Sequence, residues 1–390
     1  MTRAPGAIVI GGDHQGLGIV RSLGRRGIEV VVIDDEHSIS RHSKYVTGSH
    51  RFRELRTEEQ TLAALYAVAK RRDVEGWVIY PTRDETVAAL ARHRSRLLEH
   101  FRVPTPDWPV TRWAWDKRNT YARAAEVGIP VPRTWNIASE DELDAVDGEP
   151  PYVIKPAIKE HFIYATKCKA WRADTREELA LRFREAAELV GTEEVVIQEF
   201  IPGGSDSQLA YCAFFKGGTA RASMTVRYVR QHPAEFGRAS TYVCTADVPE
   251  LEEMSLRFLS SIGYYGLVEL EYRHDRRDGT TKLLDVNART WSYHSLGQRA
   301  GVDFPYLVYA DQIGLPAPSD VEARPGISWI RLATDLPTAA IELTRRRLDV
   351  RAYLRSVRVF DVESVFMPDD LRPGFAELAL LPYLAIKRGI

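Results

Sequence analysis

The chain has 390 residues, a formal net charge of −1 and 27% charged residues, so its overall charge favours neither nucleic acid nor an anionic membrane as a partner. Its three cysteines lie far apart and form no Cys-x-x-Cys pair, which is typical of reduced thiols. No apolar run approaches the ~20 residues that span a bilayer, and residues 1–7 lack the apolar segment of a signal peptide. We therefore expect a cytoplasmic protein of two or three domains.

Strand and helix signals alternate in the N-terminal third of the chain. Apolar strand runs are found at residues 7–10, 29–34 and 76–81, and helical patterns at 16–26 and 84–92. This β-α-β order predicts a parallel sheet with helices on both faces. The sequence thus indicates an α/β protein that begins with a doubly wound, Rossmann-like domain.

A glycine-rich turn follows the first strand. Gly11, Gly12 and Gly16 form part of a dinucleotide fingerprint, and Asp34 stands where a ribose-binding acid belongs, but Arg21 replaces the third glycine. We therefore expect the turn to lie near a substrate or to be purely structural, with a nicotinamide-dependent oxidoreductase as the competing interpretation. Further candidates for substrate recognition follow the strand ends, namely Arg41, Ser43, Thr82, Arg83, Asp84 and Glu85.

Two neighbouring strand runs, 266–272 and 283–289, carry oxygen ligands near their ends. The turn between them contains Asp278-Gly279, a strong hairpin signal. Two antiparallel strands would bring Glu271, Asp285 and Asn287 together on one wall. Two carboxylates and an amide oxygen suit Mg²⁺, which usually takes its other ligands from water and substrate phosphates. The alternative is a surface hairpin with a solvated acidic edge.

Three motifs precede this strand pair in the chain. Lys117 opens a helical stretch, Lys155 ends the strand run 152–156, and the run 195–201 passes through Glu199 into a Pro-Gly turn. In this order, and over residues 113–314, the motifs resemble the ATP-grasp superfamily. With its glycine-free segment 157–167 and its basic stretch 225–241, the sequence resembles the branch of D-aspartate ligase and related predicted carboxylate-amine ligases.

The resemblance implies ATP and Mg²⁺ as cofactors. Lys117 and Lys155 would contact the nucleotide phosphates, and Asp206 would hold the ribose hydroxyls. The strand residues at the adenine edge would be Gln198, Glu199, Phe200 and Ile201. Glu271, Asp285 and Asn287 would be the metal ligands, and Arg289 would stabilise the transferring phosphoryl group. The common pattern Glu-x-Asn-Pro-Arg is altered here, with Asp285 for glutamate and Ala288 for proline.

Two further segments allow both a functional and a purely structural interpretation. Residues 157–167 contain no glycine, whereas many relatives cover the phosphates with a glycine-rich loop. Lys159, His161, Thr166 and Lys167 would supply donors instead, or the segment is an ordinary exposed loop. In the basic stretch 225–241, Arg230 is expected to bind the acyl phosphate or the substrate carboxylate, with Arg227 and Arg238 as weaker candidates and a solvated strand face as the alternative.

These observations predict three regions: a Rossmann-like domain at 1–108, an ATP-grasp domain at 109–315 with lobes at 113–200 and 201–315, and a C-terminal extension at 316–390. The extension should hold an arginine-rich helix at 344–351 and no catalytic residues, and should pack on the core or form a homodimer contact. The resemblance implies ATP-dependent ligation of a carboxylate to an amine through an acyl phosphate. An ATP-grasp carboxylase that uses bicarbonate and a non-catalytic nucleotide sensor are the alternatives.

Overall fold

The computed structural model describes residues 4–234, 236–237 and 239–388. The first region is a parallel sheet in the order β3-β2-β1-β4, formed by Gly48–Arg51, Val30–Asp34, Ala7–Ile10 and Val78–Pro81. Its helices are α1 (His14–Gly24), α2 (Glu58–Arg71), α3 (Asp84–Arg92) and α4 (Arg94–Leu97). The expected Rossmann-like arrangement is confirmed, and every residue of β1, β2 and β4 is buried, as parallel strands covered on both faces require.

A second, smaller sheet has the antiparallel order β5-β8-β6-β7. Its strands are Thr134–Trp135, Val195–Glu199, Tyr152–Pro156 and Trp171–Ala173, covered by helices α7 (Lys159–Thr166) and α8 (Arg176–Val190). Helices α5 (Trp108–Trp115) and α6 (Lys117–Glu126) connect the first region to this sheet. The predicted boundary at residues 108–109 therefore falls at the start of α5.

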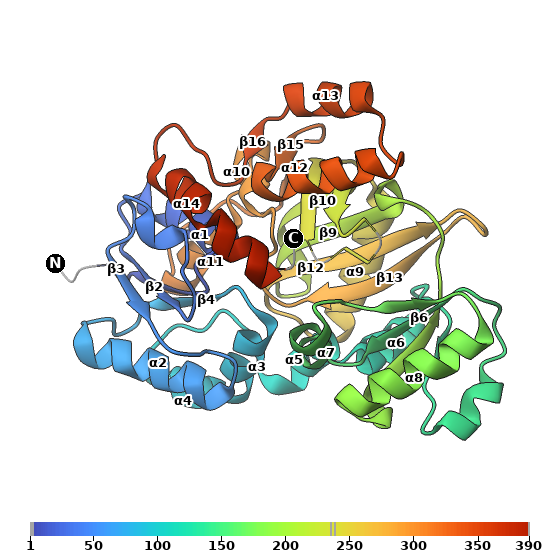
Figure 1. Ribbon diagram of the computed structural model, residues 1–390. Helices are drawn as coiled ribbons and strands as arrows, with labels where there is room; N and C mark the ends of the chain where they lie inside the picture. Colours follow the sequence, from blue (N-terminus) through green and yellow to red (C-terminus); the bar gives the residue numbers. More distant parts are fainter. Residues whose placement is uncertain (1–3, 235, 238, 389–390) are drawn as a thin grey trace.

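The largest sheet follows the order β13-β12-β9-β10-β11-β15-β16. Its strands are Thr280–Asn287, Gly266–Asp275, Gln208–Lys216, Thr219–His232, Ala239–Thr245, Ser328–Ile330 and Val362–Glu363, with β14 (Val321–Glu322) beside β10. Helices α9 (Pro249–Ser261), α10 (Ser295–Ala300) and α11 (Phe304–Ile313) belong to this part of the chain. The C-terminal extension thus adds strands to the large sheet and continues through α12 (Leu332–Thr344), α13 (Val350–Arg358) and α14 (Arg372–Arg388) (Figure 1).

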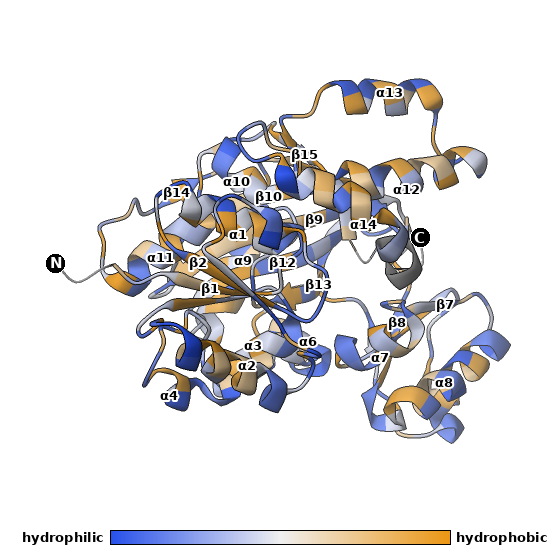
Figure 2. Cartoon of the chain, turned by 60° about the vertical axis from the view of Figure 1, so that its left-hand side comes forward, coloured by the Kyte–Doolittle hydropathy of each residue, from blue (hydrophilic) through white to orange (hydrophobic). Residues whose placement is uncertain are grey.

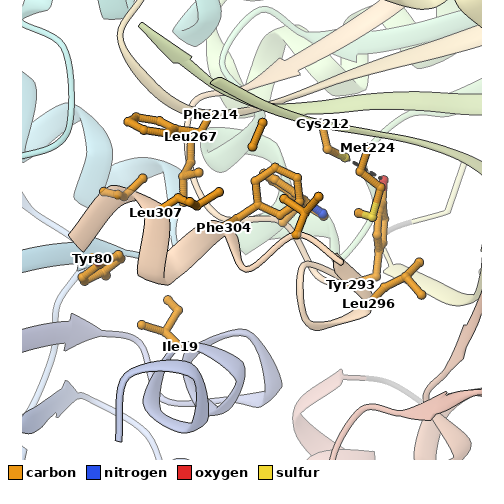
Figure 3. Packing of buried hydrophobic residues seen from close by; sticks show 14 of the residues in the cluster. Ile19, Tyr80, Cys212, Phe214, Met224, Leu267, Tyr293, Leu296, Phe304 and Leu307 are labelled. Atoms are coloured by element: carbon orange, nitrogen blue, oxygen red, sulfur yellow. Dashed lines mark hydrogen bonds between the residues drawn. The ribbon is translucent and has the colours of Figure 1, made fainter. Parts of the chain in front are cut away.

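One hydrophobic core joins the N-terminal sheet to the large sheet. Phe304 and Leu307 of α11 lie between Phe214 of β9 and the N-terminal residues Ile19 and Tyr80 (Figure 3). The hydroxyl of Tyr80 also donates to the carbonyl of Pro305 at 2.8 Å. Because burying one such aromatic or aliphatic side chain stabilises a fold by about 1.5–3 kcal/mol, this core fixes the two sheets relative to one another.

Two expectations about helices need correction. The glycine-free segment 157–167 is not an irregular loop, because Lys159–Thr166 form helix α7. Phe162 anchors this helix against Trp171, with ring centroids 4.5 Å apart, and the helix ends where Lys167 takes a left-handed conformation. The arginine-rich helix predicted at 344–351 is also wrong, since α12 ends at Thr344 and α13 starts at Val350, after Asp349 caps it.

None of the helices in the described part of the chain combines the length and the apolar character that crossing a membrane requires.

Candidate active site

The predicted strand pair forms one wall of the site. Strands β12 and β13 are antiparallel neighbours, with Glu271 opposite Asp285 and Glu269 opposite Asn287. The Nδ2 atom of Asn287 donates to Glu271 Oε1 and to Glu269 Oε2, each at 3.0 Å. The amide oxygen of Asn287 is thereby turned away from the carboxylates, toward the cationic side chains that face the wall.

Lys117 faces this wall from the start of α6. Asp116 caps the helix by accepting from the backbone N–H of Arg118, which places Lys117 in the first turn. Its Nζ atom lies 2.5 Å from Asp285 Oδ1. Burial alone would raise the pKa of Asp285, but Lys117 and Lys159 lower it to about 2. Asp285 is therefore ionised at neutral pH, as a cation ligand must be.

Lys155 reaches the same region from β6. Its Nζ donates to the hydroxyl of Tyr121 at 2.6 Å, and this hydroxyl donates to the carbonyl of Leu284, next to Asp285. Burial, and then the neighbouring Lys117, lower the pKa of Lys155 to about 7. Two lysines from different elements thus converge on the strand pair, one of them close to its titration point at neutral pH.

Arg289 links the wall to the N-terminal domain. Its guanidinium contacts both carboxylate oxygens of Asp84, at 2.9 and 3.0 Å, and its Nη2 donates to Asn287 Oδ1 at 3.2 Å. Lys159 of α7 also bonds Asp84 Oδ2, at 2.5 Å, and Asn287 Oδ1, at 3.2 Å. Burial opposes ionisation of Asp84, but Arg289 and Lys159 together hold the pKa of this carboxyl far below its usual range.

Glu269 belongs to the site but was missed in the sequence. It is buried, accepts from Tyr293 Oη at 2.5 Å and bonds Asn287. Burial, together with the nearby Glu271, raises the pKa of Glu269 to about 7. The signal was its spacing, since side chains two residues apart on a strand face the same side.

The residues expected at the adenine edge lie around the end of β8. Glu199 accepts from Lys282 and Arg277, each at 2.8 Å, and these contacts lower its pKa although burial acts in the opposite direction. Gln198 is buried and donates to Thr134, and Ile201 is buried as well. The ring of Phe200 lies against Arg172, whose guanidinium carbon is 4.6 Å from the ring centroid. Asp206 is exposed and forms an ion pair with Arg276 at 2.6 Å.

Arg230 does not face this site. Its guanidinium makes a two-oxygen contact with the buried Asp335 of α12, at 2.8 and 2.9 Å, and donates to Ser356 of α13 at 2.8 Å. It also lies over the rings of Tyr242 and Tyr353. These contacts tie the C-terminal extension to β10, so we leave Arg230 out of the proposed catalytic set. Arg227 is exposed, and Arg238 lies outside the described residues.

A cavity of about 560 Å³ extends from the strand wall to the N-terminal domain. Glu269, Glu271, Asn287 and Arg289 line it from the large sheet. Gly11, Gly12, Thr82, Arg83, Asp84 and Glu85 line it from the N-terminal domain, and Lys159, Glu160 and Tyr164 from α7. Arg41 and Ser43 do not line it, and Ser43 donates instead to Asp370 at 2.6 Å.

The glycine-rich turn forms part of this cavity wall. Gly11 has φ +95°, and a Cβ at this position would stand 2.1 Å from Thr82 Oγ1, so only glycine fits. The backbone N–H of Gly12 donates to Asp34 at 2.6 Å, and Arg83 bonds both Asp34 and Asp35 at 2.7 Å. Asp34 is thus committed to internal contacts, which disfavours the oxidoreductase interpretation, in which it would hold a ribose.

The donor set fits Mg²⁺ rather than a transition metal. Within the described residues, no three His, Cys, Asp or Glu side chains are arranged to hold a metal ion by themselves. A cation at this wall therefore needs the amide oxygen of Asn287 and additional oxygens, such as those of phosphates. Both Asp285 and Asn287 already have lysine ammonium groups against their oxygens, which shows that these positions favour positive charge.

Comparison with curated proteins finds a relative by sequence. No family model matches the chain. D-aspartate ligase from Enterococcus faecium (strain Aus0004) is 24% identical over 210 residues, which are 51% of this chain and 50% of that protein. The chain thus spans about half the length of this curated relative.

Two solved structures resemble the whole arrangement. L-amino acid ligase from Bacillus licheniformis has a TM-score of 0.65 and 16% identity, with 84% of this chain and 79% of that chain covered. The biotin carboxylase domain dimer of the Hydrogenobacter thermophilus 2-oxoglutarate carboxylase, in complex with MgADP, ADP and bicarbonate, has a TM-score of 0.65, 14% identity and coverage of 84% and 74%. The predicted resemblance is confirmed at the level of architecture: the chain has the ATP-grasp fold, preceded by a Rossmann-like domain.

Proposed function

We propose that the protein is an ATP-dependent carboxylate-amine ligase that forms an amide through an acyl phosphate and releases ADP and phosphate. The observation that carries this proposal is the convergence of Lys117, Lys155 and Arg289 on the oxygen ligands of β12 and β13. Phosphoryl transfer needs little covalent chemistry from the protein, because positioning and neutralisation of charge supply most of the catalysis.

ATP would lie between the small sheet and the large sheet. Glu271, Asp285 and Asn287 would hold Mg²⁺, which when bound neutralises phosphate oxygens. Lys117 and Lys155 would contact the phosphates from two sides, since an ammonium group is a compact charge suited to them. The residues for the nucleoside are those expected from the sequence: Gln198, Glu199, Phe200 and Ile201 for adenine and Asp206 for the ribose.

Arg289 would act at the reacting centre. Its guanidinium bonds Asp84, Asn287 and the carbonyl of Thr290, so its charge is held in place and one N–H of Nη1 remains for a substrate oxygen. A planar guanidinium matches the oxygens of a phosphoryl group or an acyl phosphate. The carboxylate would attack the γ-phosphorus, and the amine would then displace phosphate from the acyl carbon.

The cavity beside Arg289 would hold the carboxylate and amine substrates. The curated relative is named for D-aspartate and one structural neighbour for L-amino acids, so we propose an amino acid as one substrate. Arg83, Glu85 and Glu160 stand on the walls of this cavity and would contribute to its selectivity. We further propose that the enzyme acts in the cytoplasm, with small-molecule substrates, as a homodimer.

A survey of substrates tests this proposal. The protein would be incubated with ATP, Mg²⁺ and pooled L- and D-amino acids and small carboxylates, and nucleotides and new masses would be read by mass spectrometry. ADP together with a condensation product supports the ligase, whereas AMP contradicts the acyl phosphate. Asp285→Asn should abolish the product, and Asp278→Asn, at the exposed hairpin turn, is the matched control.

A carboxylase is the second candidate, because the fold also resembles a biotin carboxylase domain. Addition of ¹⁴C-bicarbonate to the same mixture separates the two. Acid-stable label in a product would replace the ligase by a carboxylase, and the absence of label with an amide product excludes it.

A further inference from the structure

The net charge of the chain conceals one strongly basic segment. Residues 345–358, which we call the arginine segment, contain one acid, Asp349, and no lysine. The segment has a formal charge of +5, while the entire chain carries −1. Its six arginines are Arg345, Arg346, Arg347, Arg351, Arg355 and Arg358.

All six arginine side chains are exposed. Arg345 has an ion-pair contact, at 3.7 Å from Glu342, and Arg355 donates to the carbonyl of Arg351 at 3.4 Å. Within the described part of the chain, no ion pair to an acid is found for the other five arginines. Their charge is therefore directed to solvent rather than used inside the fold.

Exposed apolar side chains stand among these arginines. Val350, Leu354 and the adjoining Val359 are 55%, 46% and 76% exposed. Val350 and Leu354 are four residues apart, so they lie on the same side of α13. Arg351, Arg355 and Arg358 occupy the neighbouring positions of the helix. The outward side of α13 thus combines apolar and cationic groups.

The opposite side of α13 is anchored to the body of the protein. Tyr353 is buried, and its ring lies 5.0 Å from the guanidinium of Arg230, which also bonds Ser356. The helix projects at the edge of the molecule in both ribbon views (Figures 1 and 2). It is therefore held rigidly while its mixed surface faces outward.

We propose that the arginine segment is a docking surface for an anionic phospholipid bilayer. A basic amphipathic helix lies in the plane of the membrane interface, with its apolar side chains in the headgroup region and its cations against anionic lipids. A nucleic acid duplex would match the arginines, but its phosphate backbone offers nothing to bury Val350, Leu354 and Val359. This surface acts independently of the ligase chemistry.

The size of the surface determines the kind of binding. Helix α13 has nine residues, and three apolar side chains cannot anchor a protein permanently. We therefore expect reversible binding that depends on anionic lipid and weakens with salt, because exposed charges are screened within about 10 Å at 0.1 M ionic strength.

Vesicle sedimentation with the full-length protein tests the proposal. Vesicles of phosphatidylcholine with about one third phosphatidylglycerol should bind the protein, and pure phosphatidylcholine should not. The triple variant Arg351→Gln/Arg355→Gln/Arg358→Gln should lower the partition coefficient at least about tenfold. The matched control, Arg53→Gln/Lys70→Gln/Arg71→Gln, removes the same charge from exposed sites in the N-terminal domain and should bind as the wild type does.

A second triple variant, Val350→Ser/Leu354→Ser/Val359→Ser, separates lipid insertion from simple charge attraction. It should weaken binding to the anionic vesicles while circular dichroism shows an unchanged fold. The proposal is overturned if the wild type does not bind anionic vesicles, if it binds neutral vesicles equally, or if the arginine variant binds normally. Tighter binding to a 20-base-pair DNA duplex than to the vesicles would also overturn it.

Discussion

Asp84, the first residue of helix α3 in the N-terminal domain, holds Arg289 of the large sheet through both of its carboxylate oxygens, at 2.9 and 3.0 Å. The same carboxylate binds Lys159 of α7, so three parts of the chain meet at one acid. The N-terminal domain therefore positions the arginine that we assign to phosphoryl transfer, in addition to lining the cavity beside it.

Replacement of Asp84 by alanine should impair both stability and turnover. Arg289 and Lys159 would then lose the carboxylate that bonds both of them, and breaking a buried ion pair costs about 3 kcal/mol. We expect a lower thermal midpoint and at least a tenfold lower kcat, measured by calorimetry and by ADP release. Asp73→Asn, which removes one carboxylate charge from an exposed site of the same domain away from the cavity, is the control. Normal turnover in Asp84→Ala would show that Arg289 needs no positioning by this acid.

The strand wall should be required for chemistry but not for folding. Glu271→Gln and Asp285→Asn retain the side-chain shapes while removing the charges that would bind Mg²⁺. We expect a loss of at least about 100-fold in turnover, comparable to the removal of other groups that stabilise a transition state, with an unchanged circular dichroism spectrum. If both variants turned over ATP at the wild-type rate, the metal assignment would be incorrect.

If Lys155 contacts the phosphates as proposed, ATP binding should depend on pH. Its pKa is lowered to about 7 by burial and by Lys117, so its ammonium is mostly neutral at pH 8, whereas phosphate binding favours the charged form. ATP affinity should therefore fall by up to about tenfold per pH unit above 7, and binding at pH 8 should take up protons. Calorimetry in two buffers with different ionisation enthalpies measures this uptake. Binding without proton uptake would contradict the role of Lys155.

The lowered pKa of Lys155 also makes the free energy of unfolding depend on pH, in a defined direction. An unfolded lysine remains protonated up to about pH 10, while the folded Lys155 loses its proton near 7. Between these values the unfolded state binds more protons, so the contribution of Lys155 to stability rises with pH. Lys155→Met should remove this rise from the pH dependence of the unfolding free energy.

Arg230 should be required for the stability of the C-terminal extension and not for turnover. Asp335 is fully buried, and Arg230→Met would leave its carboxylate without the guanidinium, at a cost of about 3 kcal/mol. We expect a lower thermal midpoint with ATP affinity unchanged. Lost turnover in a variant of normal stability would instead return Arg230 to the catalytic set.

Local patterns were sufficient to predict the fold, and they named most of the side chains that the structure brings together at the strand wall. The hairpin at Asp278-Gly279 determined which oxygens share a wall, and the β-α-β order gave the parallel sheet. Asp84 could not be singled out among the six candidates that follow strand ends. Its contact with Arg289 spans 205 residues and depends on how the two sheets pack, which no local pattern indicates. The contacts of Arg230 with Asp335 and Ser356 could not be predicted, because these partners lie in the extension, where no sequence pattern connects them to β10.

The acyl phosphate intermediate is tested most directly by transfer of an oxygen atom from the carboxylate substrate to inorganic phosphate. Once the carboxylate substrate is known, it would be labelled with ¹⁸O in its carboxyl group and the reaction followed by ³¹P NMR. An acyl phosphate requires one labelled oxygen to leave with inorganic phosphate when the amine attacks, so we predict the isotope shift on the phosphate signal. Label in AMP, or amide formation with unlabelled phosphate, would contradict the proposed mechanism.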